Sequence, residues 1–170
     1  MTGGGRERRL LADADKMSAL AGQSSLIDIE AVGQTLERYR VRYRCKGLFW
    51  PAGAAAPSVT ARHELDIYLH KDFPRRPPQL TWRTDIFHPN ILSYRQNGGV
   101  CVGNWSPAEG LDDLVVRIGE MVQMKVYNLD DPLDSVAAEW GRRHLDSFPL
   151  DSRPLLSPEA PPATASDDQK

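Results

Sequence analysis

Residues 87–110 read FHPNILSYRQNGGVCVGNWSPAEG. Pro89 ends a strand-like segment and favours a turn, and Asn90 tolerates the backbone conformations that turns require. The sequence Asn97-Gly98-Gly99 lets the chain fold back on itself, which brings Cys101 close to the turn at Asn90. We therefore predict that a thiol and a side-chain amide lie close together on this loop.

A thiol beside an amide suits acyl transfer. A cysteine thiolate takes an acyl group as a thioester, and an amide can stabilise the oxyanion that forms when an amine attacks it. Cys101 lies on a glycine-flanked loop, where exposed thiols are typically reactive, so we interpret it as a nucleophile. The alternative is a buried structural cysteine.

Several short motifs resemble those of the ubiquitin-conjugating enzyme family. In the family's order they are Asp72-Phe73-Pro74 with Pro77-Pro78, His88-Pro89-Asn90, Gly99-Val100-Cys101, Trp105-Ser106-Pro107-Ala108 and Asp130-Asp131-Pro132-Leu133. The resemblance covers residues 26–140. It implies a ubiquitin-conjugating-enzyme-like fold and a cysteine acyltransferase that works through a thioester.

The resemblance implies a role for each residue of the active loop. Cys101 would carry the C-terminal glycine of ubiquitin or a ubiquitin-like protein. Asn90 would either donate to the oxyanion or brace the loop, and the sequence does not separate the two. Asp131 would orient the incoming lysine and favour its neutral form; its plainer interpretation is a turn-forming aspartate. Three further residues are expected to be structural at this loop: His88, Pro89 and Trp105.

The same resemblance implies three partners: an activating enzyme, a ubiquitin-like modifier and a target protein. The N-terminal helix of the family docks on the activating enzyme, which makes its basic residues a candidate partner-binding set: Arg6, Arg8, Arg9 and Lys16. Mixed charges on a helix are more often only solvated. Arg75 follows Phe-Pro where the family often has an apolar ligase contact, a departure from the usual ligase-binding surface.

Composition favours one domain without a metal or cofactor. The chain has 170 residues and a formal charge of −2, which gives no case for nucleic acid or acidic lipid. Cys45 and Cys101 are its only cysteines and form no ligand-spaced pair, so zinc and disulfides are not expected. No apolar stretch is long enough to span a bilayer and no signal peptide is recognised. We expect a cytoplasmic protein without a membrane partner.

Hydrophobic periodicity predicts an α+β layer fold. It begins with an N-terminal helix (6–21) and a four-stranded antiparallel meander (26–32, 37–46, 59–70 and 79–83). A central long helix (111–127) is expected to pack on the sheet. A short C-terminal helix follows, capped by Asp134 or Ser135 and buried through Val136, Ala137 and Trp140. The predicted organisation is a flexible lead (1–5), a catalytic domain (6–147) and a disordered Pro/Ser/Ala-rich tail (148–170).

The predicted strand over residues 37–46 carries a row of basic side chains on one face: Arg38, Arg40, Arg42, Arg44 and Lys46. We favour an antiparallel pairing that sets Glu64 and Asp66 near this row and leaves a solvated, partly neutralised face. An acidic partner or nucleic acid is the alternative, although no outward aromatic residue is present to stack on bases. Cys45 alternates inward, as a small core residue does.

The chain departs from the family in two spacings. The segment from Asn90 to Cys101 is a few residues longer than usual, and the segment from Cys101 to Trp105 is a few residues shorter. Compact variants of this kind resemble the bacterial relatives that serve antiviral ubiquitin-like conjugation cassettes.

Two other classes of function remain open. One is a catalytically inactive module of the same fold that binds a ubiquitin-like protein, although such modules usually lack the cysteine. The other is a cysteine hydrolase that uses His63, His70 or His144 as its base, although no pattern marks a histidine oriented by a third group.

Overall fold

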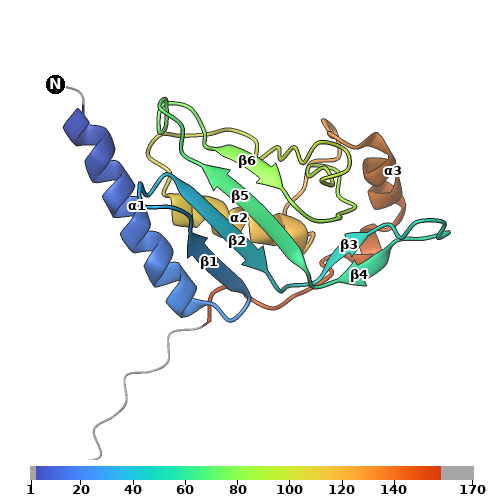
Figure 1. Ribbon diagram of the computed structural model, residues 1–170. Helices are drawn as coiled ribbons and strands as arrows, with labels where there is room; N and C mark the ends of the chain where they lie inside the picture. Colours follow the sequence, from blue (N-terminus) through green and yellow to red (C-terminus); the bar gives the residue numbers. More distant parts are fainter. Residues whose placement is uncertain (1–2, 158–170) are drawn as a thin grey trace, which may run out of the picture.

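Four antiparallel strands form the central sheet, in the order β1–β2–β5–β6 (Figure 1). Their bounds are β1 (Ile27–Ala31), β2 (Arg38–Tyr43), β5 (His63–Tyr68) and β6 (Gln79–Trp82). The computed structural model describes residues 3–157 of the chain. The α+β class and the four-stranded antiparallel meander predicted from the sequence are confirmed.

Strands β2 and β5 pair in the register that sets basic residues opposite acidic ones. Arg40 lies opposite Asp66 and Arg42 opposite Glu64, and Arg40 Nε donates to Asp66 Oδ1 at 2.8 Å. Arg44 forms an ion pair with Asp28. The row of basic side chains is therefore largely matched by carboxylates of the same sheet, which agrees with the solvated face that we favoured.

A separate two-stranded sheet corrects the prediction of one long strand over residues 59–70. Strand β3 (Gly47–Phe49) pairs with β4 (Ser58–Thr60), and the chain leaves regular strand geometry at residues 61–62 before β5 begins. His63 Nε2 lies within hydrogen-bonding distance of the carbonyl oxygens of Cys45 and Thr60, at 3.1 and 3.0 Å. This buried histidine holds the junction where β4 turns away, and Val59 is exposed as a result.

Helix α2 (Leu111–Val122) covers one face of the sheet, and the main core lies between the two (Figure 1). Tyr43 of β2 donates its hydroxyl hydrogen to the carbonyl of Val115 at 2.7 Å. The helix ends at Val122, five residues before the predicted end, because Met124 adopts a left-handed conformation with φ 57°.

Helix α1 (Gly3–Gln23) lies beside β1 and is tied to the start of α2 (Figure 1). Asp13 is buried and accepts hydrogen bonds from Leu111 N at 3.2 Å and from Arg9 Nε at 2.7 Å. The first of these satisfies a free amide at the N-terminus of α2. Because α1 begins at Gly3, the predicted flexible lead is wrong for residues 3–5, and residues 1–2 lie outside the described part.

Helix α3 (Ser135–Arg143), followed by a 3-10 turn (Leu145–Ser147), lies at the end of the molecule near the β3–β4 hairpin (Figure 1). Of the two predicted caps, Asp134 and Ser135, the structure shows Asp134, which accepts from the amides of Val136 and Ala137 at 3.0 and 3.1 Å. Ala137 is buried, whereas Val136 is exposed rather than buried as we expected.

Residues 148–157 pack on the domain, which corrects the prediction of a disordered tail from residue 148. Leu155 is buried in the main core, and Gly119 leaves room for it, because a Cβ at Gly119 would lie 2.6 Å from Leu155 Cδ1. Leu150 N donates to Gln123 O at 2.8 Å, and the buried Asp151 accepts from Lys46 N at 2.9 Å. The rest of the predicted tail, residues 158–170, lies outside the described residues.

Candidate active site

The turn at residues 88–90 and the segment before Cys101 run side by side, as predicted. Ile91 and Val100 form an antiparallel bridge, and Cys101 N donates to Asn90 O at 2.9 Å. Two backbone contacts therefore fix the position of Cys101 relative to Asn90, although ten residues separate them in sequence.

Gly98 permits the return of this loop. Its φ is 71°, and a Cβ at this position would lie 2.6 Å from the carbonyl oxygen of Trp82. Both the left-handed backbone and the close approach to β6 exclude a side chain. Asn97 Oδ1 accepts from Gly99 N at 2.8 Å and completes the turn.

The buried side chain of Asn90 is bonded at both ends to one residue. Its Nδ2 donates to Asn128 O at 2.9 Å, and its Oδ1 accepts from Asn128 N at 2.8 Å. These bonds brace the loop after α2 against the turn before Cys101. A side-chain amide nitrogen carries two hydrogens, so the Asn90 amide retains one more donor.

Asn128 in turn shapes the loop that carries Asp131. Asn128 Oδ1 accepts from the amides of Asp130 and Asp131 at 2.9 and 3.2 Å, the pattern of an Asx turn. The Asp131 side chain is exposed. The sequence predicted a turn that begins at Asn128 but gave Asn128 no role in the site.

His88 is a buried structural residue of the turn. Its Nδ1 accepts from Asn90 N at 2.9 Å, which leaves Nε2 to donate to Met121 O at 2.8 Å. Burial lowers the pKa of His88 to about 4, so the ring is neutral at physiological pH. Because both nitrogens are engaged, His88 is not available as a base.

Pro89 and Trp105 anchor the two ends of the site. Pro89 O accepts from Leu133 N at 2.8 Å and from Asp134 N at 3.1 Å, which joins the turn to the acidic loop. Trp105 Nε1 donates to Pro74 O at 2.8 Å. The segment after Cys101 is thereby held although it is short.

A pocket of about 350 Å³ brings the three predicted catalytic residues together. Cys101, Asn90 and Asp131 all contribute to its lining. Two further lining residues, Asn104 and Arg117, were missed by sequence reasoning. Arg117 lies on α2, and in the sequence it is indistinguishable from any other polar residue of an amphipathic helix. It forms an ion pair with Glu109 at 3.1 Å.

The two cysteines differ sharply in environment. Cys101 is exposed, whereas Cys45 is buried in the main core with its Sγ 3.9 Å from Gly119 O. Burial raises the pKa of Cys45 to about 12, so this thiol stays protonated at neutral pH. Cys45 is thus a core residue, as its alternation predicted.

The three histidines considered as hydrolase bases lie elsewhere. His63 is buried, its pKa is lowered to about 4 by desolvation, and it contacts backbone carbonyls. His70 Nε2 lies 2.7 Å from Pro77 O, and the His144 ring stacks on Trp140 with centroids 3.9 Å apart. Within residues 3–157, no histidine lines the pocket of Cys101.

The basic residues of α1 divide into two pairs. Arg6 donates to the carbonyls of Leu69 and His70 at 2.8 and 2.9 Å, and Arg9 bonds to Asp13 and to the segment after Trp105. Arg8 and Lys16 are exposed. Arg6 and Arg9 therefore hold α1 on the domain, and docking of an activating enzyme through this helix stays a prediction.

Sequence similarity to known proteins supports the family assignment that these motifs indicate. Residues 55–150 match the family model described as "Ubiquitin-conjugating enzyme". The chain belongs to the ubiquitin-conjugating enzyme family. Among its relatives in the family, ubiquitin-conjugating enzyme E2 S of Drosophila grimshawi is 30% identical over 117 residues, which cover 66% of this chain and 53% of that protein. Ubiquitin-conjugating enzyme E2 27 of Arabidopsis thaliana is 29% identical over 102 residues, which cover 58% of this chain and 51% of that protein.

The chain spans about half the length of the curated relatives that it matches. Among solved structures, the E2 domain of a Toxoplasma gondii ubiquitin conjugating enzyme is similar, with a TM-score of 0.59 and 25% sequence identity. The match covers 85% of this chain and 92% of that domain. The fold predicted from the motifs is therefore confirmed. Within residues 3–157, no helix has the length and apolar character needed to cross a membrane.

Proposed function

We propose that Cys101 accepts ubiquitin or a ubiquitin-like protein from an activating enzyme and transfers it to a lysine of a target protein. The observation that carries this proposal is the single pocket that holds an exposed thiol beside Asn90 and Asp131. Membership of the ubiquitin-conjugating enzyme family supports it.

The proposed reaction has two acyl transfers. In the first, the Cys101 thiolate attacks the carbonyl carbon of the modifier's thioester, and the thiolate of the activating enzyme leaves. In the second, a lysine amine attacks the Cys101 thioester, an oxyanion forms, and Cys101 leaves as a thiolate while the nitrogen loses a proton. Each step exchanges one acyl bond for another, so neither consumes water or an oxidant.

Asp131 has a chemical task in the second step. A lysine with a pKa of about 10.4 is less than about 0.1% neutral at pH 7. An exposed carboxylate at the mouth of the pocket can hold the ammonium group and accept its proton. Asn90 contributes by bracing the loop, and its remaining amide hydrogen is the proposed oxyanion donor.

The alternatives have less support. A hydrolase needs an oriented base, and the histidines of the described chain lie outside the pocket. A binding module has no use for an exposed cysteine at this turn. The relation to bacterial antiviral cassettes stays a prediction, which genes for an activating enzyme and a modifier beside this one would support.

One incubation separates the three functions. The protein is mixed with an activating enzyme, its ubiquitin-like modifier and ATP, and the products are resolved with and without reductant. We expect a covalent adduct that reductant removes. Association without an adduct would favour the binding module, and cleavage of a pre-made lysine conjugate would favour the hydrolase.

A further inference from the structure

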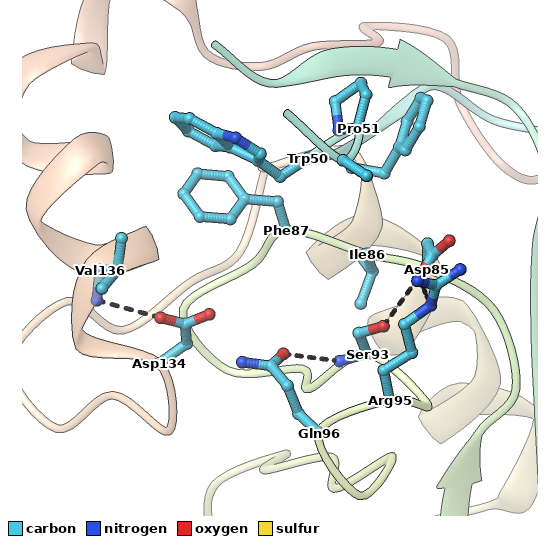
Figure 2. Close-up of a pocket in the computed structure, with 12 residues that line it drawn as sticks. Trp50, Pro51, Asp85, Ile86, Phe87, Ser93, Arg95, Gln96, Asp134 and Val136 are labelled. Atoms are coloured by element: carbon cyan, nitrogen blue, oxygen red, sulfur yellow. Dashed lines mark hydrogen bonds and ion pairs between the residues drawn. The ribbon is translucent and has the colours of Figure 1, made fainter. Parts of the chain in front are cut away.

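A second and larger cavity lies beside the active loop. It has a volume of about 690 Å³, is open to the surface, and is lined by the β3–β4 hairpin, residues 85–96 and the start of α3 (Figure 2). This volume falls within the range of about 300–1,000 Å³ that is typical of ligand sites. We refer to it as the Trp50 cavity. The proposed transfer reaction has no role for it.

The upper wall of the Trp50 cavity is aromatic and apolar (Figure 2). The Trp50 and Phe87 rings meet edge to face with centroids 5.1 Å apart, and Phe49, Pro51 and Ile86 extend this surface. Trp50 is nevertheless 40% exposed, and Val136, which lines the cavity from the start of α3, is 67% exposed. Two large apolar side chains left in water at the edge of one cavity favour an apolar occupant.

The edge of the cavity nearest the proposed active site is acidic. Asp134 lines the cavity, and Asp130 and Asp131 precede it in the loop. Asp134 uses Oδ1 to cap α3. None of these three carboxylates forms an ion pair with another residue between positions 3 and 157. This edge therefore complements a positively charged segment.

One short segment, residues 131–134, contributes to the lining of both the cavity and the pocket of Cys101. Asp131 lines the pocket and Asp134 lines the cavity. The hydrogen bonds from Leu133 and Asp134 to Pro89 O hold this segment against the turn that ends at Asn90. Asp131 and Asp134 are three residues apart in sequence. Their Cα atoms therefore lie at most about 11 Å apart, a span that an extended peptide covers in about three residues.

We propose that the Trp50 cavity binds a large apolar side chain of the target protein, located two to four residues from the lysine that is modified. Basic residues of the same target segment face the edge formed by Asp130, Asp131 and Asp134. The proposal rests on the proposed function, because it assigns the occupant as the lysine-bearing target. It makes this cavity a determinant of which lysine is chosen.

Binding is tested first on the uncharged protein, so that the result does not depend on transfer. The probes are arginine-flanked peptides with one lysine and a leucine or tryptophan two, three or four residues away on either side, and matched peptides with serine in that position. We expect an apolar peptide to shift the NMR signals of the Trp50 indole and the Val136 methyl groups, and the serine peptides to leave them unchanged. No shift at any spacing, or equal shifts with serine peptides, would overturn the proposal.

Transfer of the modifier is tested next, with protein that carries the modifier on Cys101. The acceptors are the apolar peptide and its matched serine peptide whose binding differs most. The apolar peptide should accept the modifier about tenfold faster than its serine partner at limiting concentration. Val136→Asp should reduce this ratio to about one, whereas Leu145→Asp, at an exposed position outside the cavity, should preserve it. A ratio of one in the wild type would overturn the proposal although charging succeeds. Failure to charge, with peptide binding intact, would instead contradict the proposed function alone.

Discussion

Asn90 and Asn128 form a reciprocal pair of hydrogen bonds, in which the side chain of the first both donates to and accepts from the backbone of the second. The pair joins the turn beside Cys101 to the loop that carries Asp131. Two loops separated by helix α2 are thus positioned by one buried side chain.

Removing the Asn90 side chain tests whether this residue acts only as a brace. Asn90→Ala loses both hydrogen bonds, and we expect a loss of about 2 kcal/mol in the free energy of unfolding. If the amide also donates to the oxyanion, transfer to free lysine falls about a hundredfold while charging stays near normal. The measurements are denaturant unfolding and single-turnover lysine discharge. Loss of stability with wild-type discharge would show that Asn90 only braces the loop.

The Asp131 carboxylate should matter most when lysine is protonated. We expect Asp131→Ala to charge normally and to discharge to free lysine at least tenfold more slowly at pH 7. The deficit should shrink as pH rises, because more of the amine is then neutral without help. Single-turnover discharge between pH 7 and pH 9.5 gives the profile. A deficit that is constant across this range would assign Asp131 to shaping the turn.

Two buried histidines make the fold sensitive to acid. His63 and His88 have native pKa values of about 4, against about 6.5 in the unfolded chain, so the unfolded state binds more protons between these values. Their contribution to stability is present above pH 6.5 and is lost as pH falls toward 4. We expect unfolding at pH 5 to require about 2 kcal/mol less per histidine than at pH 7. Equal stabilities at these two pH values would contradict the buried, neutral assignment.

The segment after α3 should contribute to stability through Leu155. This side chain is 4% exposed and packs in the main core. Leu155→Ala should lower the free energy of unfolding by about 2–4 kcal/mol, in line with other buried leucines. The matched control is Leu156→Ala, because Leu156 is 42% exposed and should cost little. Equal effects of the two substitutions would show that residues 148–157 do not pack as described.

The sequence predicted the parts of the fold that depend on local pattern. Alternation in β2 and β5 predicted that Glu64 and Asp66 lie near the row of basic side chains, because period two determines which residues share a face. The register that sets Arg40 opposite Asp66 comes from the structure. The return of the loop to Asn90 followed from Gly98 and its neighbours, since only glycine suits that backbone.

Features that depend on distant partners were not predictable. Leu155 looked isolated in a Pro-rich segment, and its place in the core depends on space left by Gly119, far away in sequence. Val59 has the same face as the core residues of β5 in the alternating pattern, but β4 turns away to pair with β3, and Val59 is exposed there. The bond partner of Asn90 is the backbone of Asn128, and a backbone partner leaves no sequence pattern.

The central claim is that Cys101 carries the modifier, and intact mass measurement of charged variants tests it most directly. Wild type and Cys45→Ala should gain the mass of one modifier, and the gain should disappear with a thiol reductant. Cys101→Ala should gain nothing, while Cys101→Ser should form an adduct that survives the reductant, because an oxyester resists thiols. Charging of Cys101→Ala at the wild-type level would contradict the account.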